Sequence, residues 1–290
     1  MSEVQKRKNE EIEGEEPEKR VENGDEEEDA PEIVDVDFDF FDPTEVDFHA
    51  IKNLLRQLLD SDCDNFELST LADVILDSTS RGTTVKVDGP ESDPFALVSI
   101  VDLNQHKDKP AMKTLIEYMI SKTSKKPEFN RKLRQLLAAG SKNKIGLVFS
   151  ERMINMPVEV VPPMYRLFLE EMTRESRSSE SPFDYYIIVS KAFTEEESQL
   201  DLEERRPLKR GKFQNPKEIY HFHSEDDVFH EFAEYHTYYE YSRAAQDSDS
   251  KRTFQDYGIF PKGHLILIKG DKFKPAVDQM SQKFAPPNEQ

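Results

Sequence analysis

Four histidines and two carboxylic acids lie close together in the last third of the sequence. They are His221, His223, His230 and His236, with Glu225 and Asp226 between them. Imidazole and carboxylate groups are common ligands of zinc and other divalent ions. On a strand, His221 and His223 would share a face, as a chelating pair must. The spacing matches no complete metal motif, however, and the aromatic neighbours favour structural packing, so we expect no metal here.

Two residues could act as nucleophiles, but neither has the surroundings that catalysis requires. Cys63 lies between Asp62 and Asp64, whose negative charges disfavour the reactive thiolate. Ser150 lacks the Gly-x-Ser-x-Gly elbow that exposes a hydrolase nucleophile, so we expect it to cap a turn after an apolar strand. We therefore predict no catalytic residue, and a protein that is not an enzyme.

Three short segments resemble signals that other proteins read. Basic residues that import receptors could bind occur at 6–8 and, more compactly, at Arg205, Arg206, Lys209, Arg210 and Lys212. Alternatively, each segment is an ordinary run of solvated charges that no receptor reads. The sequence Pro-Pro-Met-Tyr at 162–165 fits a WW-domain ligand, and the leucines of 51–59 fit an export signal. For both we favour a structural role, a helix start and a buried helical stripe respectively.

Negative charge is concentrated at the amino end of the 290-residue chain. The net charge is −20, and residues 1–47 hold twenty acidic and five basic side chains, including the run Asp25, Glu26, Glu27, Glu28 and Asp29. Residues 1–45 contain few large apolar side chains, so we expect a disordered acidic arm. Residues 46–290 are long enough for one folded domain. The acidic balance favours basic protein partners over nucleic acid.

The cysteine content and the hydropathy pattern indicate the kind of cellular compartment that suits the chain. A single cysteine excludes an intrachain disulfide and favours a reducing environment. No apolar run approaches the roughly 18–20 residues needed to cross a bilayer, and no signal-peptide core is visible. We therefore expect no membrane insertion.

Alternating helix and strand patterns must position these residues. We expect helices over 48–58 (with Asp47 as cap), 68–75, 109–121, 127–139, 163–172 and 274–284. We expect strands over 83–87, 95–101, 145–149, 185–189, 219–223, 235–241 and 264–269. Residues 194–216, rich in charge and broken by prolines, indicate a long exposed loop. The pattern predicts a layered α/β domain with a mixed central sheet flanked by helices.

Several longer segments of the chain are distinctive: FDFFDP and DFHAIKNLLRQLLD near the start, FALVSIVDL, SERMINMP followed by PPMY, YYIIVSKAF, and LILIKGDK near the end. These segments resemble the BCCIP family of nuclear cell-cycle and ribosome-assembly proteins. Together they run from about residue 38 to residue 271. The resemblance implies a fold like that of the GNAT acetyltransferases.

A GNAT-like fold requires that acetyl-CoA binding be considered. Those enzymes hold the cofactor's pyrophosphate on a Gln/Arg-x-x-Gly-x-Gly/Ala loop that opens a helix. Here Gln255 and Gly258 fit, but Phe260 replaces the last small residue and Pro261 follows. We expect an ordinary turn and no cofactor.

The family resemblance implies a specific role. It implies a chaperone or carrier for a basic large-subunit ribosomal protein, active in ribosome biogenesis and nuclear export. Nuclear transport receptors, and a lipid kinase as a further export cargo, are the implied partners, and shuttling between nucleus and cytoplasm is the implied localisation. An acetyltransferase-like enzyme with a degenerate acetyl-CoA loop and a general nuclear scaffold are the alternatives.

Overall fold

The computed structural model describes residues 36–77, 79–138, 140–176, 181–195, 218–242 and 258–285. The folded unit spans Asp37–Gln290. It begins before residue 46, where we expected the domain to start, because a short strand at Asp39–Phe41 pairs with the rest of the sheet. No helix within the described ranges is long and apolar enough to cross a membrane.

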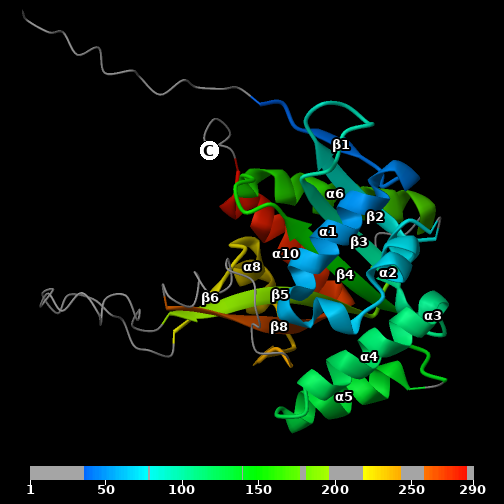
Figure 1. Ribbon diagram of the computed structural model, residues 1–290. Coiled ribbons are helices and arrows are strands. Elements are labelled where there is room, and N and C mark those ends of the chain that lie inside the picture. The colour runs from blue at the N-terminus through cyan, green and yellow to red at the C-terminus, as the bar shows by residue number, and fades with distance from the viewer. Residues whose placement is uncertain are drawn as a thin grey trace, which may run out of the picture. The chain divides into compact units, whose positions relative to one another are not determined.

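The described strands form one mixed sheet (Figure 1). They are β1 (Asp39–Phe41), β2 (Arg81–Lys86), β3 (Ala96–Asp102), β4 (Ile145–Arg152), β5 (Tyr185–Glu195), β6 (Ile219–His221), β7 (Tyr235–Tyr239) and β8 (Ile259–Lys269). Their order is β1-β2-β3-β4-β5-β8-β7, and β6 pairs with β5 beside this path. All neighbours are antiparallel except β4 and β5, which are parallel.

Helices cover both faces of the sheet. The main ones are α1 (Phe48–Leu59), α2 (Leu68–Ile75), α4 (Pro110–Lys122), α5 (Pro127–Leu137), α6 (Val161–Ser176), α8 (Glu225–Glu231) and α10 (Gly270–Lys283). Short elements are α3 (Leu103–His106), η1 (Glu45–Asp47), η2 (Asp60–Asn65) and η3 (Val158–Val160). Side chains of α1, α2, α4 and α5 share one buried cluster, and those of α6, α8 and α10 share the other. The result is a three-layer α/β arrangement.

Strand alternation explains the two clusters. Leu147 and Phe149 of β4 belong to the first cluster, whereas Val148 between them belongs to the second. Successive side chains of a strand point to opposite faces, so a central strand covered on both sides must be apolar throughout. The strands expected from the apolar runs at 95–101, 145–149 and 185–189 are confirmed as β3, β4 and β5.

The predicted single domain with a mixed sheet and flanking helices is confirmed, with local corrections. β5 extends to Glu195 and buries Thr194, so the first residues of the expected loop 194–216 belong to the sheet. β8 begins at Ile259 rather than 264. Asp47 precedes α1 as expected, but its carboxylate accepts from the Thr44 amide and pairs with Lys86, and caps no α1 amide.

A glycine is required where β8 turns into α10. Gly270 donates its amide to the Asp184 carbonyl at 2.7 Å, and a Cβ placed on it would lie 1.9 Å from the Phe183 carbonyl oxygen. Gly140, by contrast, has a φ of +85° but open space around its Cβ position. One glycine is thus required by close backbone approach and the other by its backbone conformation.

These two positions give a direct test of the packing. We expect Gly270→Ala to lower the free energy of unfolding by more than about 2 kcal/mol, because backbone atoms must move to admit the methyl group. Gly140→Ala should cost only about 1–2 kcal/mol, the penalty of a left-handed conformation. Urea unfolding of both variants measures the difference, and equal losses would contradict the close approach.

Candidate functional site

A gap opens in the sheet where β4 and β5 separate. Their parallel pairing ends at Phe149 and Val189. One edge of β5 is paired with β8 along the whole length of β5. β6 pairs with Ala192–Thr194 of β5, so it occupies the other edge, beyond the point where β4 ends its pairing. Polar and charged side chains fill the intervening space, including Glu151 from β4 and Lys191 from β5.

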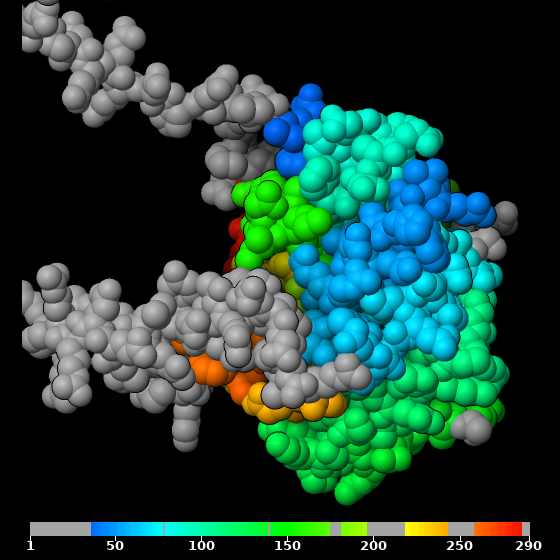
Figure 2. All heavy atoms as spheres, viewed as in Figure 1, coloured from blue at the N-terminus to red at the C-terminus, as the bar shows by residue number. Residues whose placement is uncertain are grey.

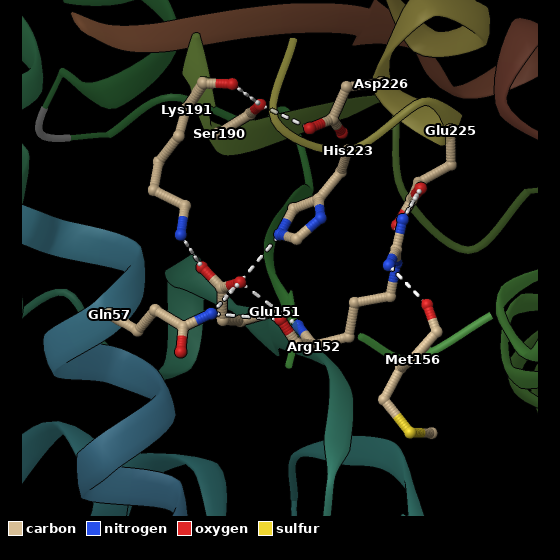
Figure 3. A network of polar contacts seen from close by, with 9 residues as sticks. All are labelled: Gln57, Glu151, Arg152, Met156, Ser190, Lys191, His223, Glu225 and Asp226. Atoms are coloured by element: carbon tan, nitrogen blue, oxygen red, sulfur yellow. Dashed lines mark hydrogen bonds and ion pairs between the residues drawn. The ribbon is translucent and has the colours of Figure 1, made fainter. Parts of the chain in front are cut away.

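Glu151 is the central acceptor of this buried charge network (Figure 3). Its Oε1 lies 2.6 Å from His223 Nε2 and accepts from Gln57 Nε2 at 2.8 Å. Its Oε2 lies 2.7 Å from Lys191 Nζ. Gln57 also donates to the Arg152 carbonyl at 3.0 Å, which joins α1 to the end of β4. One carboxylate therefore connects a helix, two strands and the turn after β6.

Arg152 and Glu225 form the second part of the network. Arg152 Nε and Nη2 donate to the two carboxylate oxygens of Glu225 at 2.9 and 3.0 Å. Its Nη1 donates to the Met156 carbonyl at 2.7 Å. Both side chains are buried, and this two-point geometry is the strongest form of arginine–carboxylate pairing.

The first turn of α8 presents three consecutive acids to three different partners. Glu225 binds Arg152, and Asp226 Oδ2 accepts from Ser190 Oγ at 2.5 Å. Asp227 Oδ1 lies 2.6 Å from Nδ1 of His221 in β6. Acidic residues suit this position because the amino end of a helix is electropositive. α8 is thereby tied to β4, β5 and β6.

Electrostatic interactions within the network oppose the cost of burial. Burial alone raises the pKa of Glu151, but the hydrogen bond from His223 and the charge of Lys191 bring it below its ordinary value. Burial alone lowers the pKa of His223, yet Glu151 and the nearby Asp226 raise it above the usual value. Burial and the charge of Glu225 raise the pKa of Asp226 to about 6. Glu151 and His223 thus favour each other's charged form.

The buried charge network has groups used in acid–base catalysis, but they are occupied with one another. A catalytic base must reach a substrate proton, and here Glu151 and Glu225 are almost completely buried and engage basic groups of the same chain. The arrangement therefore serves to hold the diverging strands and α8 together.

The histidines that we considered as metal ligands in the sequence separate into two groups. His223 joins Glu151, so it forms no chelating pair with His221, contrary to the strand argument, because β6 ends at His221. His221 and His230 instead meet His264 of β8, and one ring nitrogen from each lies within 4.8 Å of the others. His236 packs on His230 at 4.1 Å between ring centroids.

These four residues, His221, His230, His236 and His264, form the histidine cluster. Burial lowers the pKa of His264 to about 2, and that of His236 to about 4. Burial also lowers the pKa of His230. Burial thus favours the neutral form of all three side chains. No local pattern pointed to His264, because it lies 28 residues beyond the nearest of the others, and pairing of β8 with β5 and β7 brings it there.

Other residues singled out in the sequence have structural positions. Ser150 lies within β4 opposite Val98 and caps no turn, which corrects that prediction. Tyr165 is fully buried in α6 against Phe229 and Phe273, so a helix start is confirmed for Pro-Pro-Met-Tyr. The leucines of α1 are buried, as expected for a core helix. Cys63 is half-buried in η2, with its Sγ 3.8 Å from Asp64 Oδ1.

Several predicted segments lie outside the described residues. They are the acidic run Asp25, Glu26, Glu27, Glu28 and Asp29, the basic residues Arg205, Arg206, Lys209, Arg210 and Lys212, and Gln255 of the glycine loop. Gly258 is described and has a φ of +78°, and the chain then continues as strand β8. No helix begins directly after this glycine to bind a pyrophosphate.

Comparison with known proteins gives consistent matches. The family model described as BCCIP matches residues 33–229. Protein BCP1 of Yarrowia lipolytica is 46% identical over 263 residues, covering 89% of this chain and 85% of its own. The crystal structure of BCP1 from Saccharomyces cerevisiae aligns with a TM-score of 0.60 at 31% identity, covering 89% of this chain and 93% of that one.

A more distant structural neighbour is an enzyme. An N-acetyltransferase from Staphylococcus aureus aligns over 80% of this chain and 97% of its own, at 8% identity and a TM-score of 0.31. A likeness at this level carries no argument about activity or cofactor.

Removing one partner of the buried arginine pair tests the network. We expect Glu225→Gln to lower the free energy of unfolding by about 3–5 kcal/mol, because it leaves the Arg152 cation buried without its countercharge. Asp278→Asn in the exposed Lys274–Asp278 pair is the matched control and should change stability by less than about 1 kcal/mol. Denaturant titrations at pH 7 give both values. Similar losses in the two variants would show that burial of the Arg152 pair is unimportant.

Proposed function

Because the chain belongs to the BCCIP family, we propose that it is a carrier that binds and shields a basic protein client. Family membership supports a non-enzymatic role. The client we propose is a large-subunit ribosomal protein, escorted between nucleus and cytoplasm during ribosome biogenesis. Nuclear transport receptors would be its other partners, and a lipid kinase a further export cargo.

The concentration of negative charge is the observation that carries this proposal. Residues 1–47 have a formal charge of −15, whereas the remaining 39 acidic and 34 basic residues nearly balance. A ribosomal protein without its RNA has unpaired lysines and arginines that bind other polyanions. An acidic partner screens these charges and increases the rate of encounter.

The folded unit offers a surface on which such a client could dock. Phe95, Met153 and Ile154 are exposed, and Ile154 keeps 74% of its surface accessible. Phe95 and Met153 are neighbours, since the Met153 amide donates to the Phe95 carbonyl at 2.9 Å. The turn between β2 and β3, which leads to Phe95, lies at the top of the view in Figure 2.

Acidic side chains accompany this apolar surface. Asp88, Glu91 and Asp93 of the same turn are exposed. We call these six residues, 88, 91, 93, 95, 153 and 154, the β2–β3 patch. Apolar contact surface with an acidic margin suits a client segment that mixes basic and apolar residues. In this proposal the acidic arm steers the client and the patch retains it.

Deleting residues 1–32 tests the steering part. Contacts beyond or near the Debye length of about 8 Å act mainly on association, so the truncated protein should capture the client more slowly, especially at low salt, while dissociation changes little. Association and dissociation rates for a purified basic ribosomal protein, at two salt concentrations, measure this. Unchanged capture with much faster release would make the arm a direct clamp.

Replacing the apolar residues of the patch tests the retaining part. We expect Met153→Ser with Ile154→Ser to speed client release about 10-fold, which corresponds to about 1.4 kcal/mol. Leu167→Ser, which replaces an exposed apolar residue of α6 outside the patch, is the control and should leave release unchanged. Surface plasmon resonance measures both, with circular dichroism to confirm folding. Equal release rates for wild type and the double variant would exclude the patch.

Two further measurements separate the alternatives. Affinity isolation from the native host at moderate salt should recover one dominant basic partner, whereas a general scaffold would recover many. Calorimetric titration with acetyl-CoA should show no saturable binding, and binding would favour the acetyltransferase-like alternative.

A further inference from the structure

His264 has an unusual environment for a buried polar side chain. It is completely buried, and neither ring nitrogen has a hydrogen-bond partner among the described residues. Buried polar groups are nearly always satisfied, because an unpaired group loses its hydration without compensation. Ring stacking on Tyr238 at 4.3 Å accounts for the packing of His264 but leaves both nitrogens unsatisfied.

Two more histidines converge on the same place from different elements. His221 comes from β6, His230 from α8 and His264 from β8, and their three ring nitrogens lie within 4.8 Å of one another. His264 is opposite Tyr238 in the register of β7 and β8, on the sheet end that α8 and β6 cover. The tertiary fold therefore assembles the three imidazoles.

A carboxylate orients one of these imidazoles. Asp227 Oδ1 is 2.6 Å from His221 Nδ1, so Nδ1 donates and the lone pair is on Nε2. That Nε2 lies 3.0 Å from the Tyr238 hydroxyl, which is also 3.3 Å from His230 Nδ1. Both nitrogens thus face the space that the hydroxyl borders. A carboxylate that fixes the tautomer of a ligating histidine is a usual feature of metal sites.

We propose that His221, His230 and His264 bind a divalent late-transition ion, zinc in the first instance. Neutral imidazoles favour zinc and its neighbours, whereas magnesium and calcium require oxygen ligands. Three protein ligands leave a fourth position, which Tyr238 or water can fill. The ion would give one ring nitrogen of His264 a partner and would bridge β6, α8 and β8.

Metal titration of the full-length, untagged and metal-stripped protein tests the proposal. We expect calorimetry to show one Zn²⁺ per chain, Co²⁺ to give the visible spectrum of a nitrogen-ligated four-coordinate ion, and Mg²⁺ not to bind. Zn²⁺ should raise the melting temperature. His264→Gln and His230→Gln should each weaken Zn²⁺ binding at least about 100-fold, while His49→Gln, an exposed histidine of α1, should have no effect.

Asp227→Asn separates an oriented ligand set from incidental surface binding. Loss of a carboxylate that supports a ligating histidine weakens metal affinity about 10–100-fold, and we expect a change in that range. Circular dichroism of the metal-free variants identifies any that fail to fold, and His230→Gln keeps the test decisive if His264→Gln is one of them. No Zn²⁺ uptake by wild type, or uptake that is unchanged in folded His230→Gln and Asp227→Asn, would overturn the proposal.

Discussion

The separation of β4 from β5 beyond Phe149 and Val189 is the constraint on which the rest of the structure depends. Parallel strands that diverge leave main-chain groups and side chains without neighbours in the middle of a sheet, and such a gap must be filled. Glu151 and Lys191 fill it with charge, and these charges require countercharges in turn. The positions of His223 and α8 follow from that requirement.

The same constraint determines how the two helical layers are connected. Gln57 of α1 reaches Glu151 from one face, whereas Glu225 reaches Arg152 from α8, whose core residues belong to the other face. Contacts through a sheet are not possible where its strands are paired and packed with apolar side chains. The gap is therefore where the two helical layers exchange polar contacts.

The sequence predicted the helix and sheet layers but not the polar contacts that cross the sheet. Apolar runs identified the strands that prove to be central, because residues buried on both faces leave little choice of side chain. The buried charge network left no such pattern: Glu151 and Arg152 follow an apolar strand and read as its polar end, although both are buried. Glu225, the partner of Arg152, is 73 residues away from it, and His264 meets the other histidines only through the tertiary fold. Local periodicity carries no information about such distant partners.

The three consecutive acids of α8 have a consequence for the uniqueness of the fold. Successive residues of a helix point about 100° apart, so Glu225, Asp226 and Asp227 can meet Arg152, Ser190 and His221 in only one rotational setting. Apolar side chains would tolerate small rotations and shifts along the axis, whereas sliding α8 by one residue would separate every one of these pairs. Buried ion pairs add little net stability over well-packed apolar residues. The three polar contacts of α8 contribute mainly by excluding other placements of this two-turn helix.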